Sequence, residues 1–166
     1  EMVTAAIAFS NQPVPKGGRA VIVTNTGGPA IIAVDECVSA GLKLAKLSDT
    51  TKERLKKLVF QEAIVSNPVD VVATAGPDQY GGTVAALLED ANIDSLLLVF
   101  VTAPFVDCEG IARRLGELGR TATKPIICQV ITIEKWAEVI RLIRDSGIAV
   151  YAYAESAARV LGPLTQ

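Results

Sequence analysis

The stretch that decides the fold is AVIVTNTGGPAIIAVDECVSA, residues 20–40. Its apolar run at 20–24 predicts a buried strand. A turn with two adjacent glycines follows, and the apolar residues of 29–40 recur with the spacing of a helix. A strand that runs into a Gly-rich helix start is typical of α/β proteins in which the first N–H groups of the helix face an anion.

The rest of the chain continues this alternation. Further strands are predicted at 42–47, 95–101, 125–130 and 148–151, and further helices at 51–59, 78–89, 107–118, 133–145 and 155–164. Ser66 to Asp70 is predicted to be a loop, because Pro68 disfavours helix at Asn67. Five strands alternating with helices specify an α/β, flavodoxin-like, doubly wound parallel sheet, whose usual order is 2-1-3-4-5. Residues 1–18 are interpreted as a linker or the end of a preceding segment, and 19–166 as one domain.

Local signals support several of these boundaries. Gly41 is placed to end the helix 29–40, and Ser48 is placed to cap the next helix. Gly81 and Gly82 lie inside the predicted helix 78–89, where each would weaken it by about 1 kcal/mol. The sequence alone offers no reason for this pair.

Composition and charge exclude several classes of protein. Hydrophobic residues make up 50% of the chain and aromatic residues 5%, an aliphatic bias that suits a sheet covered on both faces. The net charge of −2, from 16 basic and 18 acidic residues, provides no basic field for nucleic acid. No apolar run approaches the ~18–20 residues that span a bilayer, and no signal peptide opens the chain. A cytoplasmic protein without a membrane anchor is therefore expected.

The cysteine and histidine content limits the chemistry. Cys37, Cys108 and Cys128 are dispersed without CxxC spacing, which favours reduced, structural thiols. Histidine is absent. This excludes Ser-His-Asp and Cys-His catalysis, histidine metal sites and a phosphohistidine formed within the chain. We therefore expect no metal site and no catalytic residue in the chain itself.

The candidate site follows from the topology. In open α/β sheets, ligands bind beyond the carboxyl ends of strands where the strand order reverses, here between 20–24 and 95–101. Glycines allow close approach of a ligand, and Pro29 suits the first helical turn. The turn 24–29 is therefore placed to present the first N–H groups of the helix to an anion. The end of the strand 95–101 faces the same crevice at residues 101–104, and the loop 67–70 can reach it.

The residues alone leave alternatives open for the glycine turn and for the loop 67–70. Gly27-Gly28-Pro29 is equally consistent with a tight strand-to-helix turn, and 67–70 with a capped surface turn. The turn lacks both the GK[ST] of a nucleotide P-loop and the spacing of a dinucleotide GxGxxG.

Several motifs together resemble a known family. VTNTGGP at 23–29, with Asp35 six positions on, resembles the VTNxGGP…D segment of ADP-forming acyl-CoA synthetases, in the succinyl-CoA synthetase superfamily. QPVPKG at 12–17 and SNPVDV at 66–71 resemble the family's QPLPKG and KNPVDV, and IAVY at 148–151 with Ala157-Ala158-Arg159 resembles its ending. The resemblance thus covers nearly the whole chain. One departure is Ala30, where the family usually has a further glycine.

The resemblance implies a role within a larger enzyme. The chain would be the second flavodoxin-like ligase domain of an enzyme that catalyses acyl-CoA + ADP + phosphate ⇌ acid + CoA + ATP. Asn25, Thr26, Gly27 and Gly28 would bind, through backbone N–H groups, a phosphohistidine carried by a neighbouring ligase domain. Asn67, Asp70 and Thr102 would line the same pocket. Implied partners are that histidine-bearing domain, a CoA-binding Rossmann domain and an ATP-grasp domain or subunit, and assembly into an oligomer is left open. CoA, ATP/ADP and Mg would belong to the whole enzyme, with no cofactor bound by this domain alone.

Two other functions fit the fold. The chain is compatible with a non-catalytic interaction or regulatory module that lost the phosphoryl relay. An FMN-binding flavodoxin-type carrier would use a hydroxyl-rich phosphate loop and aromatic side chains beside the flavin. The chain offers Thr24 and Thr26 for that loop but few aromatic residues near the strand ends.

Overall fold

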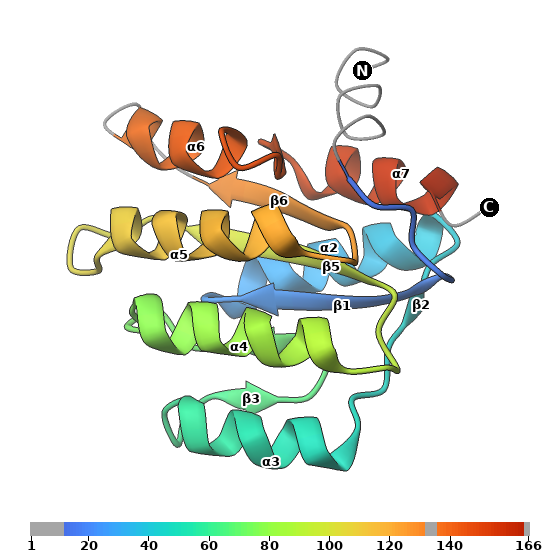
Figure 1. Cartoon of the computed structure of the whole chain (residues 1–166), viewed down its shortest axis with the longest axis horizontal. Helices are drawn as coiled ribbons and strands as arrows, with labels where there is room; N and C mark the ends of the chain where they lie inside the picture. Colours follow the sequence, from blue (N-terminus) through green and yellow to red (C-terminus); the bar gives the residue numbers. More distant parts are fainter. Residues whose placement is uncertain (1–11, 132–135, 165–166) are drawn as a thin grey trace.

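A computed structural model describes residues 12–131 and 136–164. Its elements alternate along the chain: β1 (Arg19–Thr24), α2 (Gly27–Ser39), β2 (Lys43–Leu44), α3 (Asp49–Leu58), β3 (Ile64–Val65), β4 (Val69–Asp70), α4 (Pro77–Glu89), β5 (Ser95–Val101), α5 (Cys108–Thr121), β6 (Ile126–Ile131), α6 (Ala137–Arg144), β7 (Ala149–Tyr151) and α7 (Ala154–Leu164). The strands form one sheet in the order β3-β4-β1-β5-β6-β7, with β2 also paired to β1 (Figure 1). The pairing of β3 with β4 is antiparallel and the other pairings are parallel. The predicted α/β class with a mainly parallel sheet is confirmed.

The sheet has seven strands rather than the predicted five, so the five-strand order is not confirmed. The difference lies at the outer edge of β1. There β2 pairs only with Arg19 and Ala20, and β4 pairs with Val23 and Thr24. The predicted strand 42–47 is reduced to two residues, and the predicted loop 66–70 contains β4. Two-residue strands are too short for periodicity to reveal them.

Side chains on β1 alternate between two apolar layers. Val21 and Val23 pack into the layer of α3, α4, α5 and α6, whereas Ala20 and Ile22 pack into the layer of α2 and α7. Figure 1 shows α4 and α5 in front of the sheet and α2 behind it. Because helices cover both faces of the sheet, a ligand can reach β1 only at the amino or the carboxyl end of the strand.

Several predicted boundaries are confirmed. The Thr51 N–H donates to Ser48 Oγ at 3.2 Å, and Gly41 adopts a φ of +85° directly after α2. The predicted helix 133–145 appears as α6, and its first predicted residues lie outside the described part of the chain, as does most of the predicted linker 1–18.

The three cysteines are buried free thiols, in agreement with their predicted structural role. Burial raises the pKa of the Cys37 thiol to about 12, with a further contribution from the Glu36 carboxylate. Burial also raises the pKa of Cys128 well above its ordinary value. These thiols are therefore protonated, and unreactive as nucleophiles, near neutral pH.

The structure explains the glycine pair inside α4. A Cβ on Gly81 would lie 2.2 Å from Arg114 Cγ on α5, which is far below van der Waals contact. A Cβ on Gly82 would lie 3.5 Å from Leu58, an ordinary contact distance. Gly81 is thus required by the close packing of α4 on α5, and Gly82 is not.

This difference gives a matched pair of variants. Gly81→Ala should destabilise the fold by about 1–3 kcal/mol, because Arg114 and α5 must move. Gly82→Ala should stabilise it by about 0.5–1 kcal/mol, because alanine is the better helix former. Urea unfolding of the two variants measures both free energies. Equal effects at the two positions would contradict the packing explanation.

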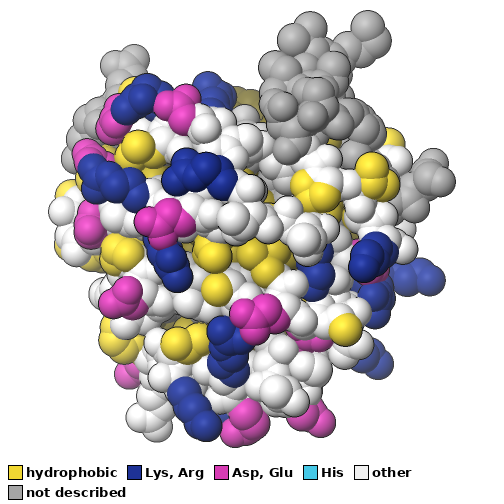
Figure 2. Space-filling view, viewed as in Figure 1, with side chains coloured by type: hydrophobic (Ala, Val, Ile, Leu, Met, Phe, Trp, Pro, Cys, Tyr) yellow, Lys and Arg dark blue, Asp and Glu magenta, His cyan; other side chains and the backbone are white. Residues whose placement is uncertain are grey.

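The surface over α3 to α6 mixes charges of both signs. Ion pairs three or four residues apart lie along these helices, such as Lys56 with Glu53 and Arg113 with Glu109. Figure 2 shows basic and acidic side chains interspersed on this face. In the described part of the chain, no helix is long and apolar enough to cross a membrane.

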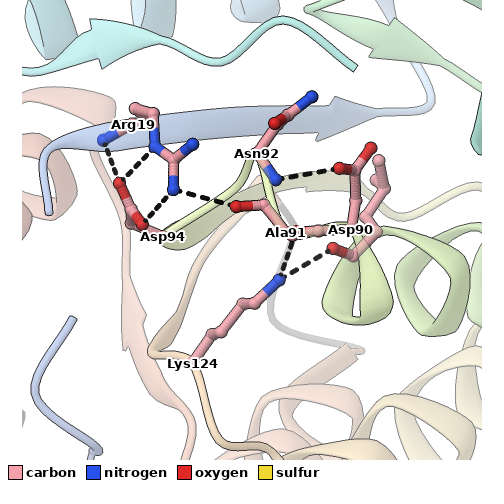
Figure 3. A network of polar contacts seen from close by, with 7 residues as sticks. Arg19, Asp90, Ala91, Asn92, Asp94 and Lys124 are labelled. Carbon is pink, nitrogen blue, oxygen red and sulfur yellow. Dashed lines mark hydrogen bonds and ion pairs between the residues drawn. The ribbon is translucent and has the colours of Figure 1, made fainter. Parts of the chain in front are cut away.

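An ion pair joins the amino ends of β1 and β5. Arg19 Nη2 lies 2.8 Å from Asp94 Oδ1, and both Arg19 Nε and the Arg19 backbone N–H donate to Asp94 Oδ2 (Figure 3). The Asp94 side chain is only 5% exposed. Its hydrogen bonds with Arg19 outweigh burial and hold the pKa of this carboxyl below its ordinary value.

This pKa shift predicts a dependence of stability on pH. A carboxyl whose pKa is lowered by folding contributes stability above the unfolded-state pKa of about 3.9, and this contribution is lost as the pH falls through the lower, folded-state pKa. Asp94→Asn should therefore destabilise the chain at about pH 7 and do so progressively less below about pH 4. Unfolding at both pH values checks this. A constant difference would contradict the ionic origin.

Candidate functional site

The candidate site lies beyond the carboxyl ends of β1 and β5. The strand order reverses at β1, because β4 pairs with one of its edges and β5 with the other. Three parallel strands thus direct their following loops to the same edge of the sheet: the turn before α2, the loop after β4 and the loop after β5.

The turn from β1 into α2 is shaped by Thr24. Its Oγ1 accepts a hydrogen bond from the Thr26 N–H at 3.0 Å and donates to the Thr26 carbonyl at 2.7 Å. Thr26 is the N-cap residue, with φ −158° and ψ 130°, yet its own side chain accepts no hydrogen bond from the helix. The amide of Thr26 is therefore used within the turn, whereas the helix start lacks the usual side-chain cap.

The first two N–H groups of α2 belong to Gly27 and Gly28, and Pro29 has none. Both glycines are exposed, and no residue of the described ranges accepts a hydrogen bond from their amides. A helix start normally pairs these groups with a side chain, water or a ligand. Their positive partial charge therefore faces the edge of the sheet.

Neither glycine is required by its own chain. A Cβ on Gly28 would meet no atom within 4 Å outside its own helix backbone and chain neighbours, and a Cβ on Gly27 would meet only Asp70 Oδ2, at 3.7 Å. The positive φ values seen at Gly41 and Gly147 are absent at both positions. The missing side chains therefore leave room for a group from outside the chain.

The Asn25 side chain serves the framework of the site. It is 3% exposed, its Nδ2 donates to the Val101 carbonyl at 2.8 Å, and its Oδ1 accepts from the Val101 N–H at 2.9 Å. This pair of bonds joins the end of β1 to the end of β5. The side chain thus positions the turn, and any contact with an anion is left to the backbone.

The Asn67 side chain is likewise used within the sheet. Its Oδ1 accepts from the Ile22 N–H at 3.0 Å, and its Nδ2 donates to the carbonyls of Ala20 and Ala45 at 2.8 and 3.1 Å. The side chain thus supplies hydrogen bonds to the backbone of β1 at the place where β2 has ended and β4 has not yet begun. The structure therefore does not bring its polar group to the helix start.

Asp70 does lie at the helix start. Its Oδ2 approaches Gly27 as described above, while its Oδ1 accepts from the Val72 N–H at 2.9 Å. A carboxylate beside the amino end of a helix is stabilised by the helix dipole. Val72 itself has a φ of +67°, a strained value for a β-branched residue. Sequence reasoning missed this strained residue, and no sequence signal marks it.

Thr102 follows β5 and lies near β6. Its N–H donates to the Ile131 carbonyl at 3.1 Å, and its hydroxyl lies 3.5 Å from the same oxygen. Ala30 is 1% exposed, so its methyl group points into the protein and away from the helix start. In the part of the chain that the structure describes, no cluster of three or more acidic or cysteine side chains is arranged to hold a metal ion.

Large apolar side chains are exposed around this edge. Ile31 and Ile32 on the first turns of α2 are 64% and 59% exposed, Phe105 in the loop after β5 is 68% exposed, and Tyr153 before α7 is 71% exposed. Side chains of this kind gathered at one edge are typical of a surface that meets another protein.

Comparison with known sequences gives consistent matches. The Ligase-CoA domain family matches residues 20–165. The alpha subunit of acetate–CoA ligase (ADP-forming) II of Pyrococcus furiosus is 36% identical over an alignment of 172 positions, which covers 100% of the chain and 37% of the relative. The 4-hydroxybutyrate–CoA ligase (ADP-forming) of Nitrosopumilus maritimus is 27% identical over 164 residues, 99% of the chain and 23% of the relative.

Comparison with solved structures gives matches of the same kind. A crystal structure from Pyrococcus horikoshii OT3 matches with a TM-score of 0.89 and 34% identity, over 99% of the chain and 38% of that protein. Acetyl-coenzyme A synthetase 1 of Ca. Korarchaeum cryptofilum, in complex with phosphate and ADP, matches with a TM-score of 0.88 and 25% identity, over 97% of the chain and 35% of that protein. The chain thus spans less than two fifths of each relative.

Proposed function

Because the chain belongs to the Ligase-CoA domain family, we propose that it is a ligase domain of an NDP-forming acyl-CoA synthetase. The whole enzyme would convert acyl-CoA, ADP and phosphate to the acid, CoA and ATP. The relatives named above as ADP-forming CoA ligases support this reaction class. The role of this chain would be to receive a phosphohistidine from a neighbouring domain at the start of α2.

The observation that carries this role is the open start of α2. Two helix amides have no partner among the residues that the structure describes, and a side chain at either glycine would meet no close contact there. A helix amino terminus carries roughly half a positive charge and presents N–H groups to an anion. A phosphoryl group fits this end by charge and by its acceptor oxygens.

The chemistry assigned to the site is electrostatic. The phosphoryl group would pass from an acyl phosphate to the histidine, which releases the acid, and then from the histidine to ADP, which yields ATP. Each transfer spreads negative charge over the equatorial phosphoryl oxygens. Fixed N–H donors aimed at these oxygens stabilise that charge without reorganising during the reaction.

Asp70 would orient the incoming imidazole. Its carboxylate lies beside Gly27, so a phosphohistidine seated on the helix amides would place its second ring nitrogen near an acceptor. Carboxylates commonly hold histidine rings through such an N–H donor. One Asp70 oxygen is already held by the Val72 N–H, which orients the other.

The partner that brings the histidine would dock on the apolar edge around the site. Ile31, Ile32, Phe105 and Tyr153 supply the exposed apolar area for such a contact. CoA, the nucleotide and Mg would be held by the other domains, as the resemblance implies. Alone, the chain should be inactive.

Reconstitution tests the proposed function. The chain is combined with the histidine-bearing, CoA-binding and ATP-grasp parts of its enzyme, and ATP formation from acyl-CoA, ADP and phosphate is followed. We expect ATP only when this chain is present. ATP formation at the full rate without it would contradict a catalytic role and favour a regulatory module.

A further inference from the structure

A second concave site lies at the opposite edge of the sheet from the start of α2. A cavity of about 520 Å³ opens at the amino ends of β1 and β5, and it is within the size range of small-molecule sites. Its basic lining residues are Lys16, Arg19, Lys43 and Lys124, and Asp94 is the carboxylate that lines it. Positive charge is therefore in excess around the cavity.

Two of these cations already have partners. Arg19 is paired with Asp94, and its Nη2 also donates to the Ala91 carbonyl at 2.9 Å (Figure 3). Lys124 Nζ donates to the Asp90 carbonyl at 2.6 Å, at the carboxyl end of α4. These contacts fix one wall of the cavity, and the Asp90 carbonyl that accepts from Lys124 is a neutral group.

Lys16 and Lys43 have no such partners. No carboxylate or carbonyl of the described residues lies within bonding distance of either ammonium group. Burial lowers the pKa of Lys124. The Asp90 and Asp94 carboxylates raise this pKa, and the positive charges of Arg19 and Lys16 lower it. Arg19 and Lys16 thus repel Lys124 more weakly than Asp90 and Asp94 attract it, and the opposite charge that an anion would supply is missing at Lys16 and Lys43 among the described residues.

Glycine backbone completes the lining. Gly17 and Gly18 line the cavity between Lys16 and Arg19. A Cβ on Gly17 would lie 2.7 Å from Asp94 Oδ2, so the backbone passes too close to the ion pair for any side chain. Of the residues that the structure covers, none accepts a hydrogen bond from the amides of Gly17 and Gly18.

We propose that this cavity binds a small polyphosphate group, as found in inorganic pyrophosphate or in the diphosphate of a nucleotide. Several ammonium groups match two linked phosphoryl groups better than a single charge. The concave shape favours a small molecule over a protein surface. This site is separate from the proposed phosphohistidine site and does not depend on it.

Calorimetric titration of the 166-residue chain with pyrophosphate tests the proposal. Binding should weaken about tenfold or more in the double variant Lys16→Ala/Lys43→Ala, which removes two charge-assisted contacts. The control Lys46→Ala/Lys57→Ala makes the same change in net charge at lysines that do not line the cavity, and should bind as the unchanged chain does. The same titration with ADP, with adenosine as its control, shows whether the cavity also binds the diphosphate of a nucleotide or only the inorganic ion.

Amide chemical shifts locate the bound anion. Shifts of the Gly17 and Gly18 amides on addition of pyrophosphate would support the proposal, whereas shifts confined to Gly27 and Gly28 would overturn it. Absence of binding at millimolar pyrophosphate, or equal weakening in the two double variants, would also overturn it. Either result would leave the role of α2 untouched.

Discussion

Replacing both Gly27 and Gly28 by valine in the assembled enzyme should lower phosphohistidine turnover about 100- to 1,000-fold, the cost of losing oxyanion-type donors. The physical reason is space. The amides remain in place, but two branched side chains would fill the position that the phosphoryl oxygens need. The fold should survive, because the chain leaves both Cβ positions free of close contacts.

The measurement is single-turnover loss of the phosphoryl group from the histidine in the presence of ADP, together with thermal unfolding of the chain. Ser39→Val is the control, since Ser39 is an exposed residue at the other end of the same helix. Normal turnover in the double variant would refute the role of α2. A large loss of stability would show instead that the glycines serve the fold.

The second large effect is expected at Asp70. Asp70→Asn should lower the same turnover by about 10- to 100-fold, because an amide orients the imidazole less strongly than a carboxylate does. The amide oxygen can still accept from the Val72 N–H, so the loop after β4 should keep its conformation. A loss of rate with unchanged stability would therefore report on the charge itself.

Asp35→Asn supplies the control for this change of charge. Asp35 is exposed on α2, and its substitution should leave turnover within about twofold of the unchanged enzyme. Equal effects of the two substitutions would contradict a specific role for Asp70 and indicate only a general effect of charge near α2.

Much of the fold was predictable because its determinants are local. The strand-to-helix turn at 24–29 and the buried strand 95–101 carry strong periodic and glycine signals, and the structure has β1, α2 and β5 there. Ser48 and Gly41 mark helix ends through their own backbone chemistry. The position of the candidate site follows from these elements, because parallel strands deliver their loops to one edge.

The details that depend on distant contacts were not predictable. Asn67 lies in a stretch interpreted as a loop, yet its amide completes the hydrogen bonding of β1 between two short strands. The left-handed φ of Val72 has no marker in the sequence. Gly81 is explained only by Arg114, which is 33 positions further along the chain. Each of these features arises from tertiary packing rather than from local propensity.

The central claim is that the amides at the start of α2 bind a phosphoryl group presented on the histidine of a neighbouring domain. The most direct test records the amide resonances of Gly27 and Gly28 in the labelled chain, first with the unphosphorylated histidine-bearing domain and then with its phosphorylated form. We predict that phosphorylation shifts these two resonances and leaves those of Gly41 and Gly147 unchanged. Identical spectra with the two forms would contradict the account.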